Sequence, residues 1–104
     1  MNSRDKGKRG ELELAHFLAR WGYATRRGQQ YSGASGDADV IGIDGVHIEC
    51  KRVEKLNLEA AYDQSVRDAR EDEVPTVMHR KNHRPWLVTL SLEDFMNILE
   101  DARK

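Results

Sequence analysis

The chain has 104 residues, of which 38% are hydrophobic and 34% charged, and its formal net charge at pH 7 is −1. This length fits one domain with a thin apolar core, so we expect residues 1–104 to form a single domain. No apolar run approaches the roughly 20 residues of a membrane span, and the charged N-terminal segment lacks the apolar stretch of a signal peptide. The single cysteine excludes an internal disulfide and a cysteine-rich zinc site. These features predict a cytoplasmic protein.

Charge is unevenly distributed along the chain. Residues 1–34 carry seven basic side chains against three acidic ones, whereas residues 53–74 carry seven acidic against three basic. A second basic cluster follows at Arg80, Lys81 and Arg84. A protein with one basic side can present it to a polyanion and keep the acidic side in solvent. Two solvated helix faces and a loop would explain the same charges, so charge alone leaves both interpretations open.

The N-terminal third predicts one helix and one short strand. Apolar residues three and four apart predict a helix over residues 5–21, ended by Gly22. Its buried stripe is expected to contain Leu14, Phe17, Leu18 and Trp21. A short strand over residues 23–27 and a flexible glycine- and serine-rich loop over residues 28–36 follow.

The middle of the chain predicts a hairpin and a second helix. Strands over residues 39–43 and 46–51 flank an Asp-Gly pair at 44–45, which is a strong hairpin-turn signal. Asn57 is placed to cap a helix over residues 58–72. Helical spacing predicts that this helix buries Leu58, Ala61, Tyr62, Val66 and Ala69.

The C-terminal third predicts strands near residues 74–79 and 86–90, then a last helix capped by Ser91. That helix is expected to turn Leu92, Phe95, Met96 and Leu99 inward, and Trp86, like Trp21 and Tyr62, is expected in the core. The resulting order, α-β-β-β-α-β-β-α, predicts an α/β fold in which a mixed sheet is flanked by helices.

The central hairpin contains the candidate catalytic and metal-binding residues. Side chains alternate along a strand, so Val46, Ile48 and Cys50 form an apolar face, while Glu49 and Lys51 lie together on the other face, about 6.6 Å apart. Asp39 begins the partner strand across the tight turn. Carboxylates from two neighbouring strands can converge on one hard cation that prefers oxygen ligands.

Such a cation could promote hydrolysis of a phosphodiester bond. Mg²⁺ polarises a phosphoryl oxygen and lowers the pKa of a bound water. Lys51 could then orient the water or stabilise the developing negative charge. The hairpin therefore predicts an Mg²⁺-dependent nuclease, with Mn²⁺ able to substitute.

The run D-A-D-V-I-G-I-D-G-V-H-I-E-C-K resembles the motif of the PD-(D/E)xK nuclease superfamily, although Ala38 stands where the motif has proline. The resemblance implies a restriction-endonuclease-like αβββαβ core and an endonuclease acting on DNA. It assigns catalysis to Asp39, Glu49 and Lys51, and the metal to Asp39, Glu49 and the carbonyl of Cys50. Asp37 is a rival for the Asp39 role, and Asp39 is preferred because it directly precedes the apolar strand.

Within the superfamily the chain resembles archaeal-type Holliday-junction resolvases and their phage and bacterial relatives. The likeness covers about residues 5–70 and includes the segment Lys6-Gly7-Lys8-Arg9-Gly10-Glu11, Gly22-Tyr23, and Ser-Gly pairs in the following loop. Such relatives are homodimers that nick opposed strands of four-way junctions in DNA recombination. The resemblance implies a cytoplasmic or nucleoid-associated protein of phage or prokaryotic origin.

The resemblance also extends the set of functional residues. It makes Glu11 a fourth catalytic and metal-binding carboxylate, although a first-turn glutamate favoured by the helix dipole would look the same. It implies DNA contacts by Lys6, Lys8, Arg9, Arg26, Arg27, Tyr31, Ser32 and Gln64. Tyr31 is an aromatic side chain in the loop that could stack on a base or sugar. A solvated helix face is the alternative for Gln64.

Other interpretations concern the histidines and the activity as a whole. His79, Asn82 and His83 suggest an HNH nuclease, but that site disperses its residues over a hairpin and a helix, whereas these lie within five positions. His16 and His47 are single histidines for which a structural role is expected, although His47 shares the Glu49 face. A DNA-binding module without activity, or a nuclease for flaps, ends or plain duplex, remains the alternative to a junction resolvase.

Overall fold

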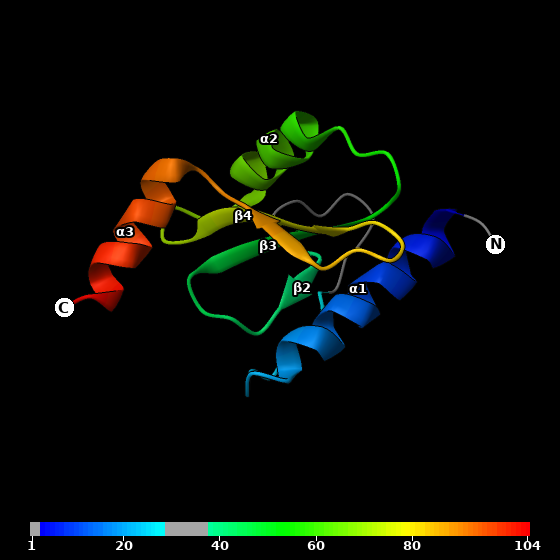
Figure 1. Cartoon of the computed structure of the whole chain (residues 1–104), viewed down its shortest axis with the longest axis horizontal. Coiled ribbons are helices and arrows are strands. Elements are labelled where there is room, and N and C mark those ends of the chain that lie inside the picture. Colours follow the sequence, from blue (N-terminus) through cyan, green and yellow to red (C-terminus); the bar gives the residue numbers. More distant parts are fainter. Residues whose placement is uncertain (1–2, 29–37) are drawn as a thin grey trace.

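The structure is a computed structural model that describes residues 3–28 and 38–104. Three helices and five strands follow one another along the chain (Figure 1). They are α1 (Ser3–Ala19), β1 (Arg26–Arg27), β2 (Val40–Ile41), β3 (Val46–Arg52), α2 (Leu58–Asp68), β4 (Val74–Arg80), β5 (Leu87–Thr89) and α3 (Leu92–Ala102). This confirms the predicted element order. No helix among the described residues is long and apolar enough to cross a membrane.

The five strands form one mixed sheet in the order β1-β2-β3-β4-β5. Neighbouring strands are antiparallel except β3 and β4, which are parallel because α2 connects them as a crossover. Helices α1 and α2 lie on opposite sides of the sheet (Figure 1). The expected α/β fold with a restriction-endonuclease-like core is therefore present.

The apolar core lies between α1 and the sheet. Leu14 and Ala15 of α1 pack on Val40, Ile48 and Cys50, and all five are at most 8% exposed. Strand alternation correctly predicted the apolar face of β3. The turn before β3 is also as predicted, because Gly45 has a φ of +81° and the Val46 N–H donates to the Ile43 carbonyl.

The prediction that Trp21 lies in the core is wrong. Helix α1 ends at Ala19, and the chain turns away there as the Gly22 N–H donates to the Ala19 carbonyl. Trp21 is 62% exposed and contacts Phe17, with ring centroids 4.9 Å apart. The other two aromatic residues expected in the core, Trp86 and Tyr62, are half-buried.

Helix α2 begins as predicted and ends earlier than predicted. The Asn57 side chain accepts the Ala60 N–H at 3.1 Å, which is the expected cap. The helix stops at Asp68 and not at residue 72, because the Glu73 carboxylate accepts the Arg70 N–H at 2.8 Å and holds the chain in a turn. Val66, expected on the buried stripe, is 47% exposed.

Helix α3 corrects a further prediction. Ser91 caps it by accepting the Asp94 N–H at 3.0 Å, as expected. None of its residues is buried, however, and Leu92 is 75% exposed. The helix follows the edge strand β5 and lies at one end of the molecule, so its apolar side has no layer to pack against (Figure 1).

Two glycines with positive φ provide a stability test. An alanine at position 42 would place its Cβ 2.5 Å from the Ala24 carbonyl oxygen, whereas at position 45 nothing lies within 4 Å. We expect Gly45→Ala to cost about 1 kcal/mol through its backbone conformation. Gly42→Ala should cost about 2–4 kcal/mol, because the neighbouring backbone must also move. Urea unfolding of both variants checks this, and equal losses would contradict the packing of β2 on residues 24–25.

Candidate active site

Asp39 immediately precedes β2 and is fixed by contacts with the backbone of β3. Its N–H donates to the Ile48 carbonyl, and its carboxylate accepts the Cys50 N–H at 2.8 Å. The carboxylate therefore replaces a backbone partner where β2 stops pairing with β3. Since Val40 pairs with Ile48 in an antiparallel register, Asp39 stands across from Glu49. The side chain is 8% exposed, which leaves it accessible from one side only.

Glu49 is a buried carboxylate on the face of the sheet that α2 covers. It is 2% exposed, and its Oε1 accepts a hydrogen bond from His47 Nε2 at 2.9 Å. Among the described residues, no partner occupies Oε2. One oxygen of Glu49 is thus used for positioning, and the other is available to a cation.

His47 is surrounded by acidic groups. Burial by itself lowers its pKa, but the hydrogen bond that it donates to Glu49 and the charges of Glu49, Glu73 and Asp68 together raise the pKa above 6.5. Its Nδ1 lies 3.8 Å from the Glu73 carboxylate and has no hydrogen-bond partner within residues 3–28 and 38–104. These acids favour the imidazolium form of His47.

The described residues contain one group of three side chains with metal-ligand atoms within 4.8 Å of one another, namely His47, Glu49 and Asp68. Asp39 and Glu11 lie outside this group. Their charges nevertheless converge on the next residue of β3, because Asp39 and Glu11 both act on the Cys50 thiol. Acidic side chains therefore lie near two residues of β3: Asp68 and Glu73 act with Glu49 on His47, and Asp39 and Glu11 act on Cys50.

Glu11 is held by an ion pair. It is 9% exposed, and Arg27 Nε donates to its Oε1 at 2.9 Å. The bond joins α1 to β1 and holds the carboxylate beside the sheet, and the catalytic role of Glu11 stays a prediction. Arg27, expected to contact DNA, is engaged with Glu11 in this structure.

Lys51 follows Cys50 on β3 and is half-buried. It pairs with His79 in the parallel register of β3 and β4. Strand alternation puts it on the Glu49 face. Asp39 and Glu49 are oxygen donors on neighbouring segments of the hairpin, but Asp39 is outside the group of side chains whose ligand atoms lie within 4.8 Å of one another. The Mg²⁺ site at Asp39, Glu49 and the Cys50 carbonyl therefore stays a prediction.

Cys50 is predicted to be chemically inert in the folded protein. Burial, with added repulsion from Asp39, Glu11 and Glu13, raises the pKa of its thiol well above the ordinary value. Because the thiolate is the reactive form, iodoacetamide at pH 8 should alkylate the folded protein at least ~100-fold more slowly than an unstructured cysteine. Mass spectrometry measures the rate, and the same protein in urea is the control. Equal rates in both would show that the thiol is not enclosed.

The remaining predicted residues divide by location. Lys8, Arg9 and Arg26 are exposed, Gln64 is half-buried on α2, and Lys6 lies within α1. Tyr31, Ser32 and Asp37 fall outside the described residues. The exposed cations therefore lie on α1 and β1, beside the strand that carries Asp39.

Sequence reasoning missed the contribution of α2. Asp68 lies three residues after Ser65 and seven after Ala61, both of which are buried, so it shares the face of the helix that packs on the sheet. That spacing was visible in the sequence and marks Asp68 as an inward acid. Glu73 follows the helix in a turn, and no spacing pointed to it.

One comparison identifies relatives of this chain. Residues 2–104 match the sequence model of a family described as "Phage putative PDDEXK endonuclease". No curated protein and no solved structure matches the chain.

Proposed function

Because the chain belongs to this family of phage PDDEXK endonucleases, it is a nuclease of the PD-(D/E)xK superfamily, and we propose that it is an Mg²⁺-dependent, structure-selective DNA endonuclease. The proposal extends to resolution of four-way junctions by a homodimer. The observation that carries the catalytic part is the Asp39 carboxylate on the Cys50 amide, across from the buried Glu49. Lys51 lies two residues after Glu49 on β3.

The residues proposed to hold Mg²⁺ are Asp39, Glu49 and the Cys50 carbonyl, with Glu11 nearby. Bound there, the ion would polarise the phosphodiester and acidify a water. The contact from His47 fixes one oxygen of Glu49, so the carboxylate is oriented before substrate arrives. Lys51 would orient the attacking water or stabilise charge on the phosphoryl oxygens.

DNA contacts are proposed for the basic residues on α1 and β1, and the structure separates two of them. Arg26 is exposed, whereas Arg27 is paired with Glu11. Arg26→Ala should remove one phosphate contact and lower the slope of log Kd against log salt by about 0.9. Arg27→Ala should in addition slow cleavage, because it releases Glu11. Fluorescence anisotropy over a salt series and single-turnover rates measure both, and equal behaviour of the two variants would count against this division.

An exposed apolar surface supports the proposed homodimer. Seven of the eleven exposed large hydrophobic residues in the described part of the chain lie between Leu87 and Leu99. We call this the C-terminal apolar face, comprising Leu87, Val88, Leu92, Phe95, Met96, Ile98 and Leu99. Monomeric proteins rarely expose large apolar patches, and burial of these residues against a second copy would provide two active sites related by symmetry.

A cleavage assay tests the function. With Mg²⁺, the protein is incubated with a four-way junction, a flap, a linear duplex and a single strand of matched sequence. Paired nicks at symmetric positions in the junction are the expected product. Cleavage restricted to flaps or duplex would replace the junction with another DNA structure. Binding without cleavage in either Mg²⁺ or Mn²⁺ would indicate that the protein is a DNA-binding module without nuclease activity.

A further inference from the structure

A second basic region of the chain forms a cleft next to the candidate active site. The cleft has a volume of about 540 Å³ and lies between residues 54–58, which precede α2, and residues 79–87, which connect β4 to β5. Lys55, Lys81 and Arg84 line it. All three are exposed and form no ion pair with the described residues. They are cations available for a ligand.

The floor of the cleft differs in character from its rim. Leu56, Leu58, Pro85 and Leu87 contribute the apolar part of the lining, which is called the floor here. Glu54 also lines the cleft, and its carboxylate accepts the Asn82 N–H. His79 also lines the cleft, and burial lowers the pKa of its imidazole, which favours the neutral ring. The volume falls within the roughly 300–1,000 Å³ of small-molecule sites. An apolar floor under a cationic rim suits a ligand with a flat apolar part joined to an anionic one.

The parallel register of β3 and β4 places this cleft beside the catalytic motif. Lys51 is the ladder partner of His79, and neighbouring strands are only about 4.8 Å apart. A ligand in the cleft would therefore lie within one nucleotide step of a phosphodiester held at Lys51.

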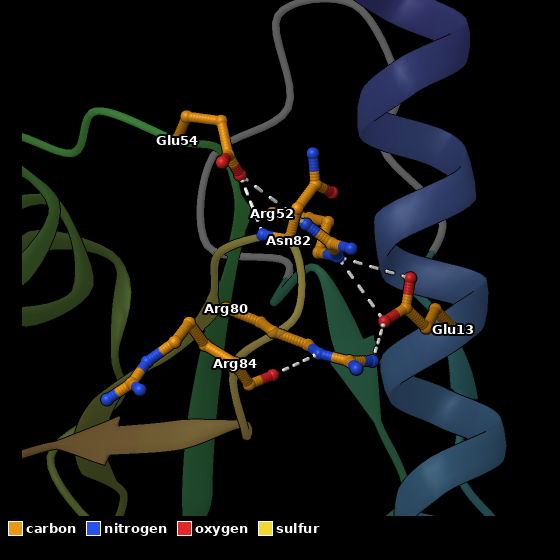
Figure 2. A network of polar contacts seen from close by, with 6 residues as sticks. All are labelled: Glu13, Arg52, Glu54, Arg80, Asn82 and Arg84. Carbon is orange, nitrogen blue, oxygen red and sulfur yellow. Dashed lines mark hydrogen bonds and ion pairs between the residues drawn. The ribbon is translucent and has the colours of Figure 1, made fainter.

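Hydrogen bonds to backbone groups of the loop between β4 and β5, which forms one wall of the cleft, hold this loop in place (Figure 2). Arg80 donates from Nε to the Arg84 carbonyl and from Nη1 to Glu13, both at 2.6 Å. The Asn82 N–H donates to the Glu54 carboxylate at 2.7 Å. Arg52 shares Glu13 with Arg80 at 3.3 Å. Figure 2 shows the Arg84 guanidinium extending away from Glu13, so the network fixes the loop and leaves this cation free.

We infer that the cleft binds one unpaired nucleotide of the DNA substrate, with its phosphate on Lys55, Lys81 and Arg84 and its base on the apolar floor. In a continuous duplex the base is paired and stacked, and it cannot reach such a floor. The cleft would therefore select DNA with a branch or an unpaired position next to the cut. This inference rests on the proposed function, and it supplies a physical basis for the proposed choice of substrate.

Equilibrium binding in EDTA, where no cleavage occurs, tests the inference with three probes. The first is a fully paired duplex, the second carries one extra unpaired nucleotide, and the third has an abasic unit in place of that nucleotide. The wild-type protein should bind the second probe about tenfold more tightly than the first, since burying roughly 50 Å² of base surface against aliphatic side chains contributes about this much. The abasic probe should lose most of the gain.

Variants assign the effect to the cleft. Leu56→Gln should reduce the tenfold preference to threefold or less while leaving duplex binding unchanged. Lys81→Ala with Arg84→Ala should weaken binding of all three probes and lower the salt slope by about 2. Arg67→Ala, an exposed cation on α2, is the matched control and should change neither quantity.

Two results would overturn the inference: equal wild-type affinity for all three probes, or a full preference in Leu56→Gln. The abasic probe decides the question on the wild-type protein even if Leu56→Gln does not fold. A protein that cleaves DNA in Mg²⁺ but binds the three probes equally would refute the cleft and keep the nuclease. A protein that neither binds nor cleaves DNA would refute the proposed function itself.

Discussion

Glu49→Gln and Asp39→Asn are each expected to lower Mg²⁺-dependent DNA cleavage by about 10³-fold or more, which corresponds to roughly 4 kcal/mol in the transition state. Each substitution removes one anionic ligand and keeps the shape of the side chain. DNA binding should persist, because neither residue is a cation that contacts phosphate. Single-turnover cleavage and anisotropy on the same DNA measure the two properties separately.

The choice of substitution at position 49 follows from the buried pair. Glu49→Ala would leave His47 in a closed acidic pocket without its hydrogen-bond acceptor, so a loss of activity could reflect damage to the fold. Glu49→Gln keeps an acceptor at that place. Glu59→Gln, an exposed acid in the first turn of α2, serves as the control and should cut at the wild-type rate. Cleavage at the wild-type rate by both Asp39→Asn and Glu49→Gln would show that this hairpin does not contain the active site.

Leu92→Glu and Phe95→Glu are expected to convert a dimer into a monomer. These side chains are 75% and 47% exposed, lie three residues apart on one side of α3, and belong to the C-terminal apolar face. A buried glutamate without a partner costs several kcal/mol, so the dimer Kd should rise by at least ~100-fold. Because α3 buries no residue, the unfolding midpoint of the monomer should change little.

Sedimentation equilibrium at several concentrations measures this change. Leu12→Glu is the matched control, since Leu12 is 40% exposed on α1 and lies outside the C-terminal apolar face. A wild-type protein that stays monomeric at high concentration would contradict the dimer and leave the face to another partner. A dimer unaffected by both substitutions would place the interface elsewhere.

The parts of the fold that the sequence predicts are those with local signals. The Asp44-Gly45 turn, the Asn57 cap and the Ser91 cap each act within a few residues, and all three are present in the structure. Alternation along β3 likewise divided its apolar face from the Glu49 face. The mixed sheet then followed from element order and crossover length.

The parts that escaped prediction depend on contacts between distant segments. Periodicity shows that α3 has an apolar side, but it does not reveal whether anything covers that side. In the same way, strand alternation correctly placed Glu49 on the face of β3 that points away from the apolar core. It could not show that the crossover helix α2 covers that face and buries Glu49. Asp68 and Glu73 reach the site through that crossover. The acidic surroundings of His47 are therefore a tertiary property.

The separation of α3 from the rest of the described chain has a consequence for how this protein can change. The residues proposed for catalysis lie on α1, β2 and β3, whereas the C-terminal apolar face lies on β5 and α3. Substitutions on α3 do not disturb the packing around Ile48 and Val40, because no residue of α3 is buried. Association and chemistry can thus evolve, or be engineered, as independent traits on one small scaffold.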